Sequence, residues 1–301
     1  MILVTGAGGK TGQAVIRALA AKGEAVRAFV HREAHAENVK ALGAQEAVVS
    51  DLRDETALRQ AMQGAQAVYH ICPNVNPDEV TIGKATMAAA REAGVQHFVF
   101  HSVVHPQAEA MPHHWSKLRV EEALFESGLS FTILQPTAYM QNLLAGWHSI
   151  VDEGVLRNPY PAETRLSLVD LEDVAEVAAL VVTEPGHNGA IYELVGTPAL
   201  SQVEVAEILS RQLGRPVRAE QQSIAAWEQR SRAAGMSDYA LDTLIQMFRY
   251  YERHGLWGSP NVLGWLLKHT PTTLPIFIAR TIRERSAPPE LRRHVPRWCE
   301  G

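Results

Sequence analysis

The sequence predicts an α/β protein built on a Rossmann-type, doubly wound parallel sheet, followed by a smaller, mostly helical α/β part. Short apolar segments alternate with helical segments from residue 2 to residue 134, and a glycine-rich turn separates the first strand from the first helix. Alternation at this spacing indicates βαβ units, whose parallel sheet is covered by helices on both faces. The 301 residues, 46% of them hydrophobic, suffice for one large or two ordinary domains with buried cores.

The elements follow in a regular order. The predicted strands span 2–5, 25–30, 46–49, 66–71, 97–101 and 130–134, and the predicted helices span 12–22, 34–42, 54–63, 78–93 and 114–127. The strand segments are apolar, as expected where both faces of a sheet are covered.

The rhythm changes after about residue 155, where prolines and glycines separate shorter elements. A helix is predicted over 201–213, with Ser201 as its N-cap and Glu204 three residues on, which is the pattern of a capping box. Residues 223–285 are helical and rich in aromatic side chains, which we expect mainly to pack a core or a contact between copies, with a substrate pocket as the alternative. The predicted division is therefore a first domain over 1–155 and a smaller region over 156–301, with some of its segments returning to the first.

Composition excludes several classes of protein. The 28 Lys and Arg against 33 Asp and Glu give a net charge of −5, without the basic surplus of a general nucleic-acid-binding protein. Cys72 and Cys299 are too few for a disulfide framework or a zinc cluster, which fits a reducing cytoplasm. No signal peptide and no apolar run of membrane-spanning length is evident. We expect a cytoplasmic protein that binds a small molecule but no nucleic acid or membrane; a homodimer remains possible.

The glycine-rich turn is the strongest motif. In VTGAGGKTG, Gly6 allows the tight turn, Gly9 allows a pyrophosphate to approach the backbone, and Gly12 allows close packing of the helix on the strand. Gly9-Lys10-Thr11 resembles the end of a nucleoside-triphosphate loop, but that loop needs a glycine where Val4 stands. We expect this turn, including Lys10 and Thr11, to bind a dinucleotide.

The end of the second strand indicates which dinucleotide. An NAD site usually has Asp or Glu there, to accept a hydrogen bond from the ribose hydroxyl. Here Val30 is followed by His31 and Arg32, and the Arg32 guanidinium suits a 2′-phosphate. Lys10 adds a second charge, whereas Glu33 next to Arg32 argues for the alternative, a merely solvated loop arginine. The predicted cofactor is NADP(H).

Several longer segments resemble the NmrA-like family of atypical short-chain dehydrogenases/reductases. They are VTGAGGKTG, AFVHR, SDLRD, FVFHSVVHP, PHHWSKLRVEEALFESGLSFTILQPTAYMQN, LVDLEDVAEVAA and YELVGTPALSQVEVAEIL, in the expected order over most of 1–215. The resemblance implies NADP(H) binding by a Rossmann domain with a small substrate domain. Some members reduce quinones, dyes or other conjugated compounds, and others sense the dinucleotide without known catalysis. We expect an oxidoreductase acting on a planar, electron-poor compound; the alternative is a non-catalytic regulatory protein that binds a protein partner.

The catalytic residues depart from the usual pattern. Catalytic short-chain dehydrogenases carry Tyr-x-x-x-Lys, in which the tyrosine acts as general acid. Lys117 occupies the lysine position, but His113 stands four residues before it, on the same helical face. Lys117 is therefore the predicted ribose-binding residue, and His113 or a water molecule the proton donor. Ser102 is followed by Val103 and Val104, which lack a catalytic hydroxyl and put alcohol–ketone chemistry in doubt.

The other candidates follow strand ends, where ligands bind in such folds. The predicted cofactor contacts beyond the glycine loop, His31 and Arg32 are Asp51, Leu52, Ile71, Cys72, Ser102, Lys117, Gln135, Pro136 and Thr137. The residues expected to face the substrate are His101, His105, Tyr139 and Asn142. The histidines between 101 and 114 match no closed zinc pattern, so no metal site is predicted.

Overall fold

The computed structural model describes residues 1–286, which form two compact units. The first contains 1–136 and 172–193, and the second contains 137–171 and 194–286. The first unit thus ends before the predicted boundary at residue 155, because the chain leaves the large sheet after Pro136 and its next strand pairs with residues 168–169. Cys299 lies outside the described residues.

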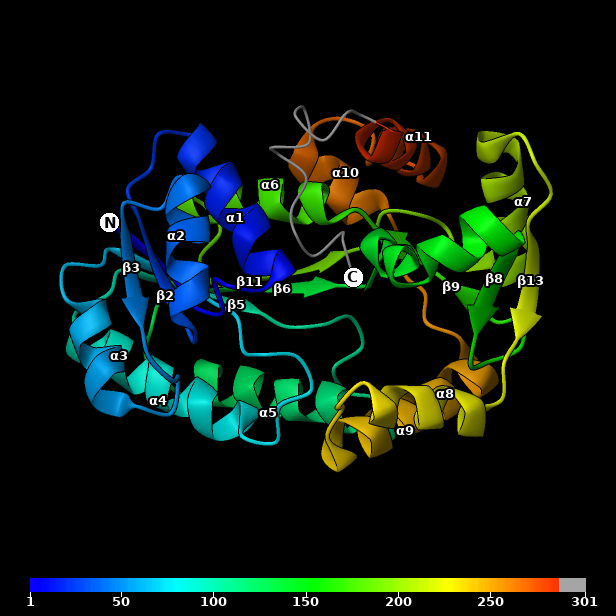
Figure 1. The fold of residues 1–301 in the computed structure, drawn as a ribbon. Helices are drawn as coiled ribbons and strands as arrows, with labels where there is room; N and C mark the ends of the chain where they lie inside the picture. Colours follow the sequence, from blue (N-terminus) through cyan, green and yellow to red (C-terminus); the bar gives the residue numbers. More distant parts are fainter. Residues whose placement is uncertain (287–301) are drawn as a thin grey trace. The chain divides into compact units, whose positions relative to one another are not determined.

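A seven-stranded parallel sheet forms the centre of the first unit, in the order β11-β6-β5-β4-β1-β2-β3 (Figure 1). Its strands are β1 (Ile2–Val4), β2 (Val26–Val30), β3 (Glu46–Val49), β4 (Ala67–His70), β5 (His97–His101), β6 (Phe131–Pro136) and β11 (Ala190–Leu194). The order reverses at β1, which pairs in parallel with both β2 and β4. The predicted doubly wound parallel sheet is confirmed.

Helices cover both faces of this sheet. They are α1 (Lys10–Ala21), α2 (Glu33–Ala41), α3 (Glu55–Met62), α4 (Glu79–Glu92), α5 (Pro112–Phe125) and α6 (Leu171–Thr183). Figure 1 shows α1, α2 and α6 on one face and α3, α4 and α5 on the other. Leu3, Phe98 and Ile133 from three strands meet Leu58 and Leu124 from two helices in one buried core.

The seventh strand, β11, was missing from the predicted elements. The Gly189 N–H donates to the Phe131 carbonyl at 2.7 Å, and the Thr137 N–H donates to the Leu194 carbonyl at 3.1 Å, so β11 and β6 run in the same direction. As an edge strand, β11 is only partly buried and carries Tyr192 and Glu193, which interrupt its apolar pattern. The continuous apolar run that indicates a central parallel strand is therefore weak here.

The second unit combines short strands with helices. The strands are β7 (Ala138–Tyr139), β8 (Val155–Asn158), β9 (Arg165–Leu166), β10 (Leu168–Val169), β12 (Leu200–Ser201) and β13 (Arg218–Gln221). The helices are the 3-10 helix η1 (Met140–Gly146), the π-helical turn η2 (Ser149–Glu153), α7 (Gln202–Leu213), α8 (Ile224–Ala233), α9 (Asp238–His254), α10 (Asn261–Leu267) and α11 (Leu274–Ser286). The strands form three pairs, β7 with β10, β8 with β13, and β9 with β12.

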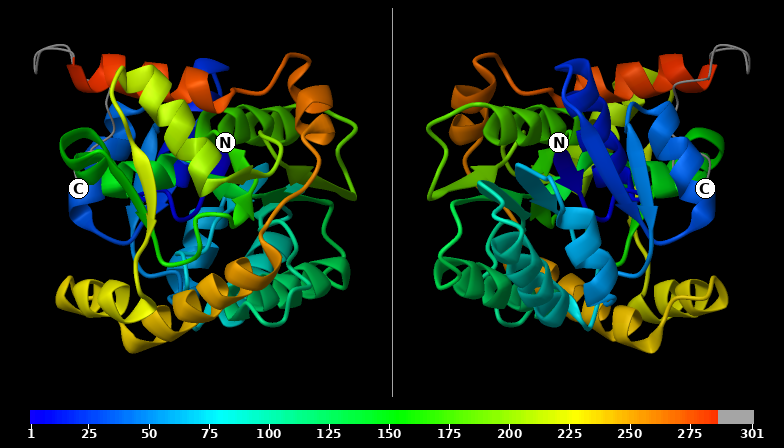
Figure 2. Two further views of the ribbon diagram at one scale, coloured as in Figure 1. Left: turned by 90° about the vertical axis from the view of Figure 1, so that its right-hand side faces the viewer. Right: turned by 90° about the vertical axis from the view of Figure 1, so that its left-hand side faces the viewer.

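One apolar core holds the second unit together. Leu209 of α7 and Phe277 of α11 belong to it, and the two views of Figure 2 show these helices side by side. The predicted capping box is confirmed at the start of α7, where Ser201 Oγ accepts from the Glu204 N–H at 3.2 Å and the Glu204 carboxylate accepts from the Ser201 N–H at 2.7 Å.

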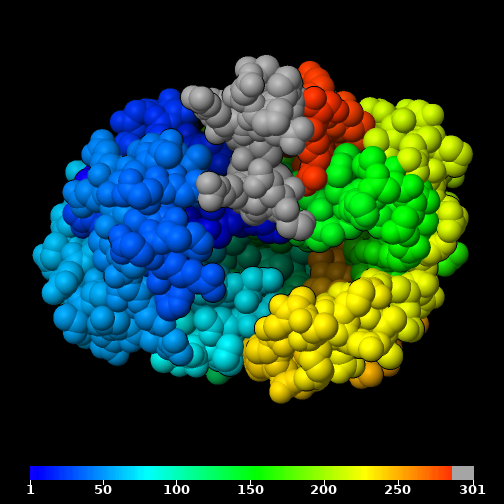
Figure 3. Space-filling view, in the orientation of Figure 1, coloured from blue at the N-terminus to red at the C-terminus, as the bar shows by residue number. Residues whose placement is uncertain are grey.

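The aromatic residues of the second unit divide into two sets. Trp227 of α8 packs edge-on against Phe248 of α9, with ring centroids 4.7 Å apart, and Tyr251 lies beside Tyr160. These two helices form one yellow surface ridge in Figure 3. Trp257 and Trp265 are instead 59% and 73% exposed, so only the first set packs within the unit.

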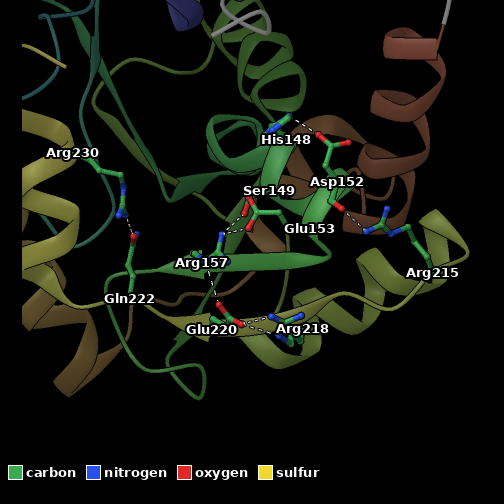
Figure 4. A network of polar contacts seen from close by, with 10 residues as sticks. All are labelled: His148, Ser149, Asp152, Glu153, Arg157, Arg215, Arg218, Glu220, Gln222 and Arg230. Atoms are coloured by element: carbon green, nitrogen blue, oxygen red, sulfur yellow. Dashed lines mark hydrogen bonds and ion pairs between the residues drawn. The ribbon is translucent and has the colours of Figure 1, made fainter. Parts of the chain in front are cut away.

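A surface network of charges fixes η2 to the β8–β13 pair (Figure 4). The Arg157 guanidinium donates to Glu153 at 2.6 Å, to Ser149 at 2.7 Å and to Glu220 at 3.2 Å. Arg218 also forms an ion pair with the Glu220 carboxylate.

Among the helices of residues 1–286, none has the length and apolar character of a membrane span.

Candidate functional site

The glycine loop between β1 and α1 is tightly packed at both ends and open at its middle. Gly6 has a left-handed backbone, with φ of +57°, and a Cβ there would lie 2.6 Å from the Ile71 carbonyl oxygen. A Cβ on Gly12 would lie 2.6 Å from the backbone of Ala7. Gly9 is exposed, and the nearest atom to a Cβ there is 3.4 Å away. Neighbouring backbone thus closes the positions of Gly6 and Gly12, whereas the open position, Gly9, is the one where the pyrophosphate is predicted to approach.

The N-terminus of α1 suits an anion. Its N-cap is Gly9, no side chain caps it, and its first turn holds no acidic residue but begins with Lys10 and the buried Thr11. Gln13 Nε2 donates to the Gly8 carbonyl at 2.8 Å and so holds the loop against its own helix. The helix dipole and the first-turn N–H groups favour a phosphate at such a position, so the residues fit the pyrophosphate of a dinucleotide.

The end of β2 presents basic side chains beside this loop. His31 and Arg32 are exposed, and Arg32 is the N-cap of α2, without a side-chain capping bond. Within residues 1–286 no carboxylate forms an ion pair with Arg32. His35 lies against the loop, since a side chain at Gly8 would collide with its ring. The sequence reasoning missed His35, although it stands one helical turn after Arg32.

Asp51, after β3, is already bound to an arginine. Arg53 donates to its carboxylate through Nε at 3.0 Å and through Nη2 at 2.7 Å, and His31 Nδ1 lies 3.8 Å from its Oδ2. These bonds hold the pKa of Asp51 well below its usual range. Leu52 next to it is buried. Arg53 was not among the predicted site residues.

The end of β4 is held by a buried threonine. Thr5 Oγ1 lies 2.9 Å from His70 Nδ1, donates to the Ile71 carbonyl at 3.1 Å and accepts from the Ile71 N–H at 2.9 Å. The Cys72 thiol is buried, and burial together with the Glu79 carboxylate raises its pKa strongly. Cys72 is therefore a neutral thiol at the site rather than a nucleophile.

Three buried polar residues form a stripe on α5 at intervals of four residues: His113, Lys117 and Glu121. Lys117 Nζ donates to Glu79 Oε1 at 2.9 Å and to the His101 carbonyl at 3.4 Å, and it lies 5.5 Å from the centre of the Phe100 ring. The predicted placement of His113 and Lys117 on one helical face is what the structure has. Glu79, the first residue of α4, was not predicted.

Glu121 connects the ends of β5 and β6. It accepts a short hydrogen bond from Ser102 Oγ and two bonds from Gln135 Nε2, at 2.9 and 3.1 Å. Burial raises the pKa of Glu121. Ser102 and Gln135 were predicted as cofactor contacts. In the structure their side chains are hydrogen-bonded to Glu121, a carboxylate that the sequence reasoning missed.

The histidines near Lys117 are uncharged. Burial, with the charge of Lys117, lowers the pKa of His70 and His101 to about 3 and that of His113 to about 4. Burial and His113 lower the pKa of His114 to about 3. Among the described residues His113 Nδ1 has no hydrogen-bond partner, and its ring packs edge-on against His114, with ring centroids 4.6 Å apart. At neutral pH none of the four is an imidazolium.

The remaining predicted residues are distributed over both units. Pro136 ends β6, and His105, with a φ of +52°, accepts a contact from His114 Nδ1 at 3.3 Å through its carbonyl. Thr137, Tyr139 and Asn142 belong to the second unit, where Thr137 donates to the Ser167 carbonyl at 3.0 Å, Tyr139 is half-buried and Asn142 is exposed. Residues 1–286 contain no group of three His, Cys, Asp or Glu side chains arranged to hold a metal ion.

Comparison with known proteins identifies the family. The model of the NmrA-like family matches residues 1–278. The NAD(P)H azoreductase of Xenophilus azovorans is 34% identical over 273 residues, which are 90% of this chain and 92% of the azoreductase. Quinone oxidoreductase 2 of Escherichia coli is 29% identical over 278 residues, 91% and 96% of the two chains.

A solved structure agrees in fold. The crystal structure of the NADPH-dependent quinone oxidoreductase of Escherichia coli, complexed with NADPH, has a TM-score of 0.82 at 27% identity and covers 94% of this chain and 100% of its own. The resemblance seen in the sequence motifs is thus confirmed over nearly the whole described chain. The chain belongs to the NmrA-like family.

Proposed function

We propose that this protein is an NADP(H)-dependent reductase that transfers hydride to a small, planar, electron-poor acceptor such as a quinone or a dye. The observation that carries the proposal is the site around Lys117, where the buried ammonium lies at the carboxyl edge of the sheet and the usual tyrosine position holds His113, a neutral imidazole at pH 7. The similarity to an azoreductase and a quinone oxidoreductase supports the same class of reaction.

Three groups of residues in the first unit would bind the cofactor. The glycine loop and the N-terminus of α1 would hold the pyrophosphate, and Arg32 and Lys10 would pair with the 2′-phosphate. Lys117 would bind and orient the nicotinamide ribose. The reduced nicotinamide supplies a hydride when bound; the other steps belong to the side chains of this chain.

The neutral imidazole at the usual tyrosine position favours an acceptor that needs no side-chain acid. Reduction of a ketone to an alcohol needs a proton at the developing alkoxide, which a tyrosine supplies in related dehydrogenases. A quinone that accepts a hydride becomes a hydroquinone monoanion, which is stable enough to take its proton from water. A cationic triarylmethane dye that accepts a hydride becomes a neutral molecule and needs no proton. His113, as a neutral imidazole, would then contact the ligand without protonating it. The proton donor of the first hypothesis is therefore proposed to be water.

The direct test is NADPH oxidation against a panel of quinones, azo and triarylmethane dyes, and simple ketones. We expect turnover with the quinones and the dyes and none with the simple ketones. Lys117→Met should abolish turnover, whereas Lys84→Met, on the exposed face of α4, should not. Tight NADPH binding without turnover of any acceptor would instead support the alternative, a dinucleotide-sensing regulatory protein.

A further inference from the structure

A buried ion pair joins α4 to α5 at the carboxyl ends of β4 and β5. Glu79 is 2% exposed, and the side chain of its partner Lys117 is 11% exposed. We propose that Glu79 is a positioning residue of the reductase site, whose carboxylate sets where the Lys117 ammonium lies. This inference rests on the proposed function, because the position of Lys117 matters through the ligand that it would hold.

The contacts of Lys117 leave its ammonium one defined direction. Two of the three N–H donors have partners within residues 1–286, Glu79 Oε1 at 2.9 Å and the His101 carbonyl at 3.4 Å. The Phe100 ring covers the same ammonium at 5.5 Å. The third donor remains for a ligand hydroxyl. A flexible four-carbon side chain therefore becomes a fixed donor through its contact with Glu79.

Glu79 is the charged group that determines this arrangement. The imidazoles of His70, His101 and His113, which surround Lys117, are neutral at pH 7. Glu121, one turn further along α5, is hydrogen-bonded to Ser102 and Gln135 rather than to Lys117. Glu79 is thus the one carboxylate among residues 1–286 that forms an ion pair with Lys117, and water screens that pair little.

Glu79 is itself held in place by its local structure. As the first residue of α4, its carboxylate lies at the positive end of the helix dipole. Its N–H donates to the Asn76 carbonyl at 3.2 Å, and Asn76 Oδ1 accepts from the Asp78 N–H at 2.9 Å. The loop before it holds Val75 at a φ of +51°, which is costly for a β-branched residue. The fold keeps this loop shape although it is strained.

The test begins with Glu79→Gln, which preserves shape and a hydrogen-bond acceptor but removes the charge. We expect kcat to fall by about tenfold to a hundredfold, because a displaced orienting group costs that much. The NADPH dissociation constant, measured by fluorescence titration, should change by less than about threefold, because the proposed phosphate contacts at the glycine loop and Arg32 do not include Glu79 or Lys117. Glu79→Asp, which keeps the charge, should recover part of the kcat. Glu92→Gln, at the exposed end of the same helix, is the matched control.

A double-mutant cycle shows whether Glu79 acts through Lys117. The cycle is read from stability, because Lys117→Met alone should abolish turnover. The double variant Lys117→Met/Glu79→Gln should melt higher than the sum of the two single effects predicts, since neither charge is then left buried without its partner. If Glu79→Gln does not fold, two other measurements test the positioning role. A double variant that folds and a Glu79→Asp variant with a reduced kcat would support it, whereas a Glu79→Asp variant with wild-type kcat would contradict it.

The outcomes separate the two proposals. A Glu79→Gln variant with wild-type kcat, or single effects that simply add, would overturn the positioning role while the reductase remains active. Wild-type protein that binds no NADPH and reduces no acceptor would overturn the proposed function, and this inference with it.

Discussion

Arg32 is the residue on which the choice between NADPH and NADH depends. It is exposed at the start of α2 and belongs to no ion pair within residues 1–286, so its guanidinium is available to a phosphate. A charge-assisted, bidentate contact contributes about 1.5–3 kcal/mol, or roughly a tenfold to a hundredfold change in affinity. We expect Arg32→Ala to weaken NADPH binding by that factor and to leave NADH binding nearly unchanged. Equilibrium titration with both dinucleotides measures this.

Lys40→Ala is the control for Arg32→Ala. Lys40 is on the same helix but pairs with Glu37 at 3.1 Å, away from the loop. Equal losses of NADPH and NADH affinity in Arg32→Ala would mean that Arg32 is only a solvated charge.

At the residue scale, local spacing predicted positions but not partners. The interval of four residues placed His113 and Lys117 on one face of α5, because a helix repeats every 3.6 residues. The partner of Lys117 is Glu79, 38 positions earlier and on another helix, and no local pattern connects the two. The charge of His113 was equally out of reach, since it depends on burial by distant elements.

The β1–loop–α1 element makes a prediction with its own control. Gly12→Ala places a methyl group against the backbone of Ala7, which cannot move without separating the helix from the strand. We expect a loss of about 1–3 kcal/mol in the free energy of unfolding, measured with urea. Gly9→Ala has room for its methyl group, so stability should stay near wild type while NADPH affinity falls. Unchanged NADPH binding in Gly9→Ala would place the pyrophosphate elsewhere.

The contact between α11 and the segment before α6 stabilises the second unit. Arg280 Nη2 donates to Asp170 Oδ2 at 2.6 Å, and Gln141 Nε2 donates to Asp170 Oδ1 at 2.7 Å. Asp170 is fully buried, so its charge depends on such donors. Arg280→Ala should lower the free energy of unfolding by about 3 kcal/mol, whereas Arg283→Ala, exposed on the same helix, should change it little. Similar urea midpoints for both variants would contradict this.

At the element scale, the sequence predicted what depends on continuous patterns. Six of the seven strands of the large sheet were predicted, because each is a mainly apolar run, and five of them are followed by a helix. The capping box of α7 was predicted from two residues three positions apart. Strand β11 and the two-residue strands of the second unit are too short or too polar for such a pattern, and their pairing depends on segments far along the chain.

For the whole molecule, the composition predicted which classes of ligand are favoured, and the structure shows where the charged side chains lie. The net charge of −5 excluded a general nucleic-acid-binding surface, and the basic groups proposed for the cofactor are correspondingly few and local. Four of the thirteen histidines in the sequence, His70, His101, His113 and His114, are buried and neutral in the first unit. Sequence could count these histidines but not assign their charge, because burial is a property of the complete fold.

That buried group makes the stability of the protein depend on pH. In the folded state His70, His101 and His114 have pKa values of about 3, whereas the pKa of a histidine in the unfolded chain is about 6.5. Below about pH 6.5 the unfolded chain therefore binds more protons than the folded protein, so stability is greatest above that pH and falls as the pH is lowered toward 4. Each such histidine contributes at most about 1.4 kcal/mol per pH unit.

We expect the free energy of unfolding of the ligand-free protein, measured with urea, to fall by several kcal/mol between pH 7 and pH 5. His114→Gln should reduce the slope by about one proton. A stability that is constant from pH 7 to pH 5 would mean that these imidazoles are not neutral in the folded protein.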